Sequence, residues 1–451
     1  MSLKEITTEK GHHSPSPSTA ESVKESQSVV DYELGGSKFS HGIEREAQGS
    51  SFLAYFNVVC VVAGTGALQL PYALAQGGWL GILILFLSWF FSTYSGVILI
   101  RCLYYDGQSR LNSYQEVAER AFGKIGGWIA FFFTAITLIG VPVLYVMLAG
   151  QNLHAVCKGT SAELTMPIWT IICACIVGVP YIFFKSLKEV GFTSLFGVLT
   201  TIITVLIVLG MSIKDSYDRD LSGAHHDPVI WPMFPIALSS ITFSFGGNPI
   251  YPHVEAGMRN PHHWPRVIFG GLTTCVAIYF LCAIPGYYYY GSEVESPVYN
   301  SLPDSNPKLA AIIIITAHVL LAMPVLMTSF ALDLEKIFKI STFHRSRWLE
   351  FTLRLIVRLV YIIVVTIIAV EVPSFGNIMA LLGAFSNCTL IFIFPFIFYY
   401  KLTGFRNKPW YELIFGAIAI ILGLVGLIFG SKSAIEGLMV EFGPGGSYSS
   451  S

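Results

Sequence analysis

A segment from Ser51 to Gly77 contains no Asp, Glu, Lys, Arg or His, yet glycines interrupt it near its middle. Gly64 and Gly66 flank Thr65 there, and glycine is among the poorest residues for a helix interior. A broken helix presents unpaired amides on one side and unpaired carbonyls on the other, and these groups bind small polar molecules. A continuous helix whose glycines pack closely against a neighbour is the alternative for this stretch taken alone.

A second break is predicted near Gly246, where two glycines precede Asn248-Pro249. Proline lacks the amide that a helix needs and disfavours the helical conformation at the residue before it. Inside a membrane such breaks survive only where they line a cavity, because unpaired backbone groups are costly in hydrocarbon. The residues expected to form a binding site at the two breaks are Ala63, Gly64, Thr65, Gly66, Phe243, Ser244, Phe245, Gly246 and Gly247.

The composition places both breaks in a membrane. Of the 451 residues, 53% are hydrophobic and 12% are charged, whereas soluble domains carry about 25% charged residues. The sequence predicts an all-α polytopic membrane protein. We expect eleven transmembrane helices, near residues 51–77, 79–101, 128–156, 167–184, 191–212, 232–256, 266–288, 309–332, 351–371, 374–400 and 410–430.

The distribution of positive charge indicates how these spans are oriented. With the N-terminus in the cytoplasm, 22 of the 27 Lys and Arg residues fall on the cytoplasmic side and 5 on the other. Cytoplasmic loops of membrane proteins carry such an excess. The formal net charge of −1 gives no electrostatic basis for binding nucleic acid. The expected partners are therefore the lipid bilayer and a small-molecule substrate.

The spans divide into two similar blocks. Spans one to five cover residues 51–212, spans six to ten cover residues 232–400, and the first span of each block is the broken one. Because five is odd, the second block must cross the membrane in the opposite sense. Broken helices that open two inverted repeats are typical of secondary transporters with a midplane binding site. The extra helix, residues 410–430, completes a transport domain that spans residues 51–430.

The two ends of the chain differ from this domain. Residues 1–50 are rich in Ser, Glu, Lys and His and lack apolar periodicity, which is typical of a disordered tail. This cytoplasmic tail is a candidate for binding regulatory partners. Residues 431–451 are expected to form a short flexible tail on the non-cytoplasmic side.

Ionisable residues are scarce inside the spans, and this limits the substrate. Arg354 and Arg358 are expected at the inner turns of the ninth span, reaching the cytoplasm, which leaves His318 as the clear interior candidate. A charged substrate side chain would need a counter-charge, since an unpaired charge is costly at the midplane. A zwitterion needs none, because its carboxylate can lie at a helix N-terminus and its ammonium among carbonyls. Neutral amino acids are therefore the expected substrates.

Three motifs occur in order along the chain. They are Gly64-x-Gly66-x-x-x-Leu70-Pro71-Tyr72-Ala73 followed by Gly77-Gly78-Trp79-x-Gly81, then Ser113-Tyr114 with Ala121-Phe122-Gly123, then Phe245-Gly246-Gly247-Asn248 with Tyr251-Pro252-x-x-Glu255-x-x-Met258-Arg259-x-Pro261. Together they resemble the amino acid/auxin permease family over essentially residues 50–430. The resemblance implies a LeuT-type 5+5 inverted repeat with discontinuous helices one and six. It also implies amino acid transport driven by an ion gradient, with the substrate held at the two breaks.

A proton is favoured over sodium as the coupling ion. His318 titrates near neutrality in principle and could carry a proton; a histidine that only holds helices together through hydrogen bonds is the alternative. By the same resemblance, hydroxyl ligands for sodium lie low on the eighth helix, where Thr328 and Ser329 are found. Sodium-coupled relatives carry a threonine in this region, and Ala322 at that position would favour protons.

Other functional features are open or not expected. Glu255 beside Arg259 is a candidate gate salt bridge, also for ion coupling, or an ordinary interfacial pair. We expect no cofactor, no metal site and no enzyme, since no ligand spacing and no nucleophile–base pair is found in the spans. A transporter-like amino acid sensor, which signals without moving its substrate, is the alternative function. The membrane is either the plasma membrane or a vacuolar or other endomembrane.

Overall fold

The computed structural model of the protein describes residues 49–107, 109–183, 187–218, 224–340, 347–372, 375–406 and 408–442. Its longer helices are α2 (Ser51–Val62), α3 (Gly66–Gly77), α4 (Leu80–Leu103), α5 (Tyr114–Cys157), α6 (Met166–Phe183), α7 (Leu187–Asp218), α8 (Phe234–Phe243), α9 (Tyr251–Ala256), α10 (Trp264–Tyr290), α11 (Asn306–Ile337), α12 (Arg347–Glu371), α13 (Phe375–Leu382), α14 (Phe394–Thr403), α15 (Trp410–Val425) and α16 (Ser431–Phe442). The predicted tail of residues 1–50 lies outside the described residues except for its last two. Its expected binding of regulatory partners stays a prediction.

Within the described ranges, nine helices are long and apolar enough to cross a membrane, and the bent pair α2–α3 makes a tenth span. The predicted sixth span, near residues 232–256, is instead divided into α8 and α9, of 10 and 6 residues. Each is far shorter than the ~20 residues that a helical span requires. The all-helical fold with broken first and sixth helices is thus confirmed, while the count of eleven stays a prediction.

The last span runs further than predicted. α15 continues through a π-helical turn, Gly426–Gly430, into α16, which reaches Phe442. The expectation of a flexible tail from residue 431 is therefore wrong for its first twelve residues. Ala434 explains the difference, because it is fully buried in a small cluster with Ile236 and Ala380. Residues 443–451 lie outside the described part of the chain.

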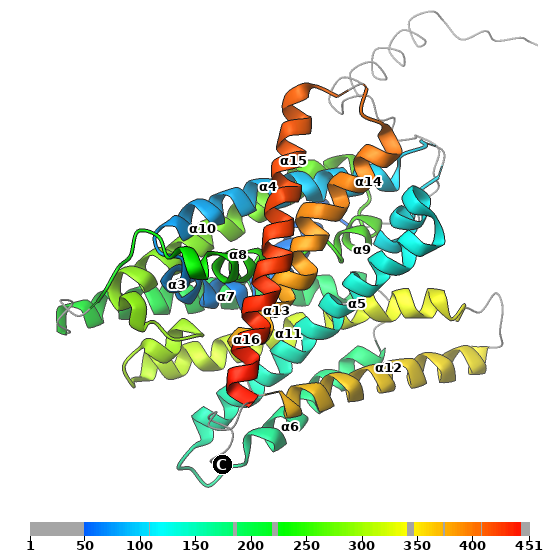
Figure 1. Ribbon diagram of the computed structural model, residues 1–451. Coiled ribbons are helices and arrows are strands. Elements are labelled where there is room, and N and C mark those ends of the chain that lie inside the picture. The colour runs from blue at the N-terminus through cyan, green and yellow to red at the C-terminus, as the bar shows by residue number, and fades with distance from the viewer. Residues whose placement is uncertain are drawn as a thin grey trace, which may run out of the picture.

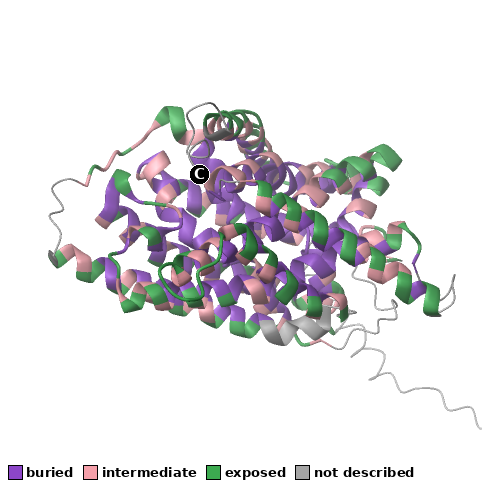
Figure 2. Cartoon of the chain, turned by 90° about the horizontal axis from the view of Figure 1, so that it is seen from below, coloured by how far each residue is buried: buried purple, intermediate pink, exposed green. Residues whose placement is uncertain are grey.

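The two broken helices lie inside the bundle. α3 packs against α8 and α10, and α2 packs against α7 and α10. α6 and α12 run side by side along one edge, and α15 runs across the front of the bundle in this view (Figure 1). Buried residues fill the centre and exposed residues follow the outer helices (Figure 2). The outer faces still carry large apolar residues, such as Ile367 of α12 at 57% exposed, as a lipid-facing surface requires.

An ion-pair cluster ties α11 to α12. Glu335 of α11 accepts a hydrogen bond from Arg358 at 3.1 Å and forms an ion pair with Arg354 at 3.0 Å. Arg358 also donates to the carbonyl of Tyr181 in α6 at 2.8 Å. These arginines were expected to reach the cytoplasm, but Arg358 is 2% exposed. The expectation is wrong for Arg358, because the carboxylate of Glu335 on the neighbouring helix pairs with it inside the bundle. Arg354 is partly exposed and pairs with Glu350 of its own helix as well as with Glu335.

Candidate functional site

The first break leaves backbone amides without backbone partners. α2 ends at Val62 and α3 begins at Gly66, and the two helices meet at 44°. Among the described residues, the amides of Gly64, Thr65 and Gly66 donate to no backbone carbonyl. The hydroxyl of Thr65 is buried close to the side chain of Tyr145. This break therefore presents several donors at the positive end of α3.

The second break lies at the carbonyl end of α8. After α8 ends at Phe243, the amides of Ser244, Phe245 and Gly246 each bond to a carbonyl three residues earlier, at 3.0–3.1 Å. The chain then continues in turns to Tyr251, where α9 begins. With these amides already engaged, the break is the negative end of α8.

The two breaks contact each other directly. A Cβ atom at position 66 would lie 2.8 Å from the Cα of Ser244, so only glycine permits this approach. The hydroxyl of Tyr279, on α10, donates to the carbonyl of Val62 at 2.5 Å and also lies within hydrogen-bond distance of the carbonyl of Ser244. The structure thus brings the predicted residues of both stretches together. Gly246 is partly exposed, and the other eight predicted residues are buried.

A π-helical segment, Gly383–Ile393, supports the second break from the tenth span. Asn387 within it donates to the carbonyl of Phe243 at 3.4 Å and accepts from Thr137 of α5 at 3.3 Å. π-Helical turns are frequent at functional sites. Sequence reasoning missed both Asn387 and Tyr279. An amide in the middle of an apolar span was the signal that could have identified Asn387.

His318 of α11 lies beside the first break. Its Nδ1 is 2.7 Å from the carbonyl of Gly197 and 3.0 Å from the hydroxyl of Thr201, both on α7. Its Nε2 is buried without a hydrogen-bond partner in the described structure. A Cβ atom at Gly64 would lie 3.1 Å from this nitrogen and 2.6 Å from the hydroxyl of Tyr145. The sequence placed His318 inside a span, and the structure adds that it faces a break.

The other expected coupling residues are separate from this group. The hydroxyls of Thr328 and Ser329 are buried and have no hydrogen-bond partner in the described structure. They lie ten residues further along α11 than His318, a distance of about 15 Å at the rise of an α-helix. His318 and the two hydroxyls therefore represent two distinct candidate ion sites.

Glu255 closes one end of the bundle, but with a different partner from the one expected. It pairs with Arg110 at 2.8 Å and accepts from the hydroxyl of Tyr104 at 2.7 Å. The expected pairing with Arg259 is not formed, because α9 ends at Ala256 and Arg259 is exposed beyond it. This end of the bundle is thus held by an ion pair between α9 and the loop that follows α4.

Two further contacts close the same end. His253 of α9 lies 3.3 Å from Asp333 of α11. Gly49 exchanges backbone hydrogen bonds with Gly257 and Arg259, at 3.0 and 2.8 Å. Together with the pair of Glu255 and Arg110, these contacts link the second break's short helix to three other parts of the chain.

The opposite end is hollow. A polar cavity of about 430 Å³ lies between the ends of α3, α5, α8 and α13. Its lining residues include Tyr72, Gln76, Gln151, Glu295 and Asn377. A bundle that is closed at one end and hollow at the other corresponds to one of the states through which an alternating-access protein passes.

Comparison with known proteins identifies the family. A family model described as transmembrane amino acid transporter protein matches residues 47–436. The chain belongs to this family of amino acid transporters. Amino acid transporter AVT1I of Arabidopsis thaliana is 27% identical over 404 residues, covering 87% of this chain and 98% of the relative. The vesicular inhibitory amino acid transporter of Xenopus tropicalis is 25% identical, covering 86% and 77%.

Solved structures show the fold of the transporter. MhsT in complex with L-phenylalanine aligns with a TM-score of 0.58 at 13% identity, covering 86% of this chain and 100% of MhsT. Mhp1, a nucleobase-cation-symport-1 family transporter, aligns with a TM-score of 0.57, covering 90% and 96%. The transporter therefore has the LeuT-type fold. Family and fold are those of multi-pass membrane transporters rather than enzymes.

The contact between the breaks generates a first prediction. Replacing Gly66 or Gly246 by Leu should abolish uptake of amino acids by the transporter but preserve its membrane insertion. The added side chain would push the two breaks apart, because a Cβ at position 66 already collides with Ser244 and one at position 246 collides with Asn387. Radiolabelled uptake, normalised to protein inserted in the membrane, measures the effect.

Gly210→Leu is the matched control, because a Cβ at this glycine of α7 has no heavy atom within 4 Å. We expect it to transport as the unmodified protein does. Normal uptake by Gly66→Leu and Gly246→Leu would contradict the proposed location of the substrate.

Proposed function

We propose that this transporter moves neutral amino acids by alternating access, with substrate bound where the two helix breaks meet. The observation that carries the proposal is the pairing of helix ends of opposite polarity. The amides of Gly64, Thr65 and Gly66 at the start of α3 suit a carboxylate. The end of α8, at Phe243, suits an ammonium group. A zwitterionic amino acid carries both groups, because its carboxylate and its ammonium are attached to the same α-carbon.

The surroundings of the breaks favour a substrate with an uncharged side chain. Phe243 and Phe245 are buried at the second break, and the nine predicted site residues include no ionisable group. Glu255 and Arg110 are already paired with each other at one end of the bundle. A charged side chain at the breaks would thus lack a counter-charge, which is unfavourable at this depth.

The closed end, which contains Glu255, is proposed to face the cytoplasm. This assignment follows the excess of Lys and Arg on the side of the N-terminus. Substrate would then enter from the non-cytoplasmic side through the polar cavity. Opening of the other side requires that Glu255 separate from Arg110 and that His253 separate from Asp333.

His318 is proposed to carry the coupled proton. The carbonyl of Gly197 only accepts hydrogen bonds, so Nδ1 carries the hydrogen of the neutral ring. Nε2 then presents its lone pair toward Gly64. Protonation there would place a positive charge beside the amides that are proposed to hold the substrate carboxylate. Because opposite charges stabilise each other, proton and substrate would each favour binding of the other.

The transport function is tested with the full chain in proteoliposomes. With an acidic exterior and a neutral interior, we expect labelled alanine to accumulate above its external concentration. Unlabelled neutral amino acids should compete with it, and glutamate and lysine should not. Binding of alanine without uptake would instead identify a sensor, and strong competition by lysine or glutamate would contradict the proposed substrate class.

The role of His318 is tested by His318→Gln, which retains a donor for the carbonyl of Gly197 but cannot titrate. We expect the variant to lose accumulation driven by a proton gradient and to retain exchange of labelled for unlabelled alanine. Exchange needs the two breaks only, whereas accumulation needs the proton step. Both rates are measured in the same proteoliposome preparation.

His154→Gln is the matched control, because His154 bonds to the carbonyl of Leu164 at the exposed end of α5. It should retain both activities. Full accumulation by His318→Gln would show that His318 is structural. Accumulation that requires a sodium gradient would instead assign coupling to Thr328 and Ser329.

A further inference from the structure

An apolar groove lies on the outer surface of the bundle, remote from the helix breaks. It has a volume of about 390 Å³ and lies between α14 and α15, with one wall from the start of α5. Its lining residues are Phe122, Ile397, Tyr400, Lys401, Phe405, Leu413, Ala417 and Ile420. The groove thus opens on the surface that faces lipid and is lined by hydrocarbon along most of its length.

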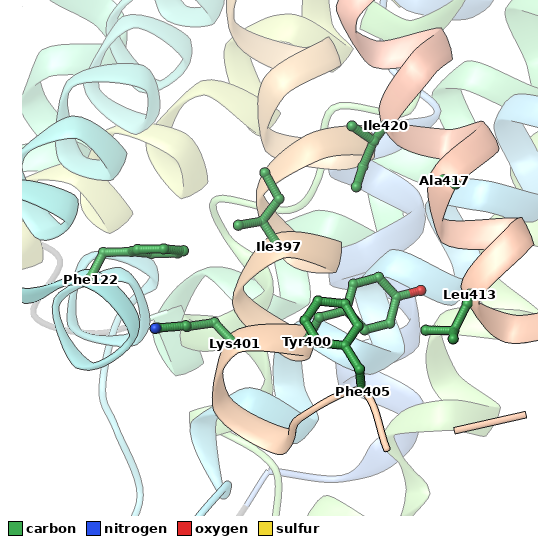
Figure 3. A pocket seen from close by; sticks show the side chains of 8 residues that line it. All are labelled: Phe122, Ile397, Tyr400, Lys401, Phe405, Leu413, Ala417 and Ile420. Carbon is green, nitrogen blue, oxygen red and sulfur yellow. The ribbon is translucent and has the colours of Figure 1, made fainter. Parts of the chain in front are cut away.

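The groove has a polar end and an apolar end. Ile397 lies six residues before the end of α14 and Ile420 lies ten residues after the start of α15. Lys401 lies in the last turn of α14 and Phe405 in the loop beyond it (Figure 3). Gly404 ends α14 with a positive φ of 77°, and this turn places the ring of Phe405 on Tyr400, with centroids 5.3 Å apart. Aromatic residues of this kind gather at the membrane–water interface.

Two cations belong to this stretch of chain: Lys401 lines the groove, and Arg406 directly follows the lining residue Phe405. In the part of the chain that the structure describes, neither Lys401 nor Arg406 forms a salt bridge, and both are exposed. Lys401 extends toward the ring of Phe122, with its Nζ 5.9 Å from the centroid. The neighbouring Lys408 differs, since it lies 3.8 Å from Glu412 and 3.4 Å from the centre of the Tyr399 ring.

We propose that this groove binds an anionic phospholipid, with an acyl chain between α14 and α15 and the phosphate near Lys401 and Arg406. The hydrocarbon lining matches the chain, and the unpaired cations match the negative head group. In the proposed orientation this end faces the cytoplasm, and the cytoplasmic leaflet carries the anionic lipids. Basic pockets between transmembrane helices on that side bind anionic head groups.

The site is tested by native mass spectrometry of the full-length protein, released from micelles that contain equal amounts of palmitoyl-oleoyl phosphatidylglycerol and phosphatidylcholine. We expect the protein to retain phosphatidylglycerol in preference to phosphatidylcholine. The double variant Lys401→Gln/Arg406→Gln should lower this preference by roughly fivefold for each cation removed, since each is worth about 1 kcal/mol near an anionic surface.

Two further variants separate the parts of the site. Ala417→Phe should lower retention of phosphatidylglycerol by filling the groove, because Ala417 is an exposed residue of its wall. Lys432→Gln is the charge control, because this exposed lysine lies on α16 beside Glu436, and it should leave retention unchanged.

Four results would overturn the proposal. An unchanged preference in the double variant would show that the cations do not bind the head group. Unchanged retention in Ala417→Phe would show that the chain does not lie in the groove. Displacement of the lipid by excess glycerol 3-phosphate would show that the head group binds alone. If the protein is a dimer and Ala417→Phe dissociates it, the groove would instead be assigned to contact with a second copy of the protein.

Discussion

Backbone amides and carbonyls cannot remain unpaired in hydrocarbon, and the architecture of this transporter depends on that constraint. Two helices break inside the bundle, so other parts of the protein must surround the freed groups. Tyr279 donates to the carbonyl of Val62 at the first break and lies within hydrogen-bond distance of the carbonyl of Ser244 at the second, and Asn387 donates to the carbonyl that ends α8. The amides of Gly64, Thr65 and Gly66 donate to no backbone carbonyl in the described residues and are the groups proposed to bind the substrate carboxylate. Because protein encloses the breaks, groups that would be costly in lipid are available for this proposed site.

The same arrangement relates substrate binding to conformational change. The second break separates α8 from the short helix α9, and α9 carries the contacts of Glu255 and His253 that close one end of the bundle. A movement at the break therefore acts on a helix that forms the closure. On the other side of the first break, Nε2 of His318 faces Gly64, so a change in its charge would be felt where the carboxylate is proposed to lie. The proposed substrate site thus adjoins His318 at the first break and is linked through α9 to the contacts that close the bundle.

Much of this organisation can be predicted from the sequence, because its signals are local. Glycine pairs and Asn248-Pro249 disrupt helices wherever they occur, and the apolar runs and charge bias define the spans and their proposed orientation. Partners across the bundle could not be predicted. Tyr279 is distant in sequence from the carbonyl of Val62, and Glu255 selects Arg110 rather than the adjacent Arg259 because α9 ends between them. Pairings of this kind depend on how helices pack, which single-helix patterns do not contain.

The central claim is that an amino acid lies between the two breaks, with its carboxylate on the amides of the first. A cryo-electron microscopy structure of the full-length protein, determined in saturating alanine and again without it, tests this most directly. We predict added density within hydrogen-bond distance of the amides of Gly64, Thr65 and Gly66 and adjoining the end of α8. Continuous helices through residues 51–77 and 232–256, or alanine bound elsewhere with both breaks unoccupied, would contradict the account.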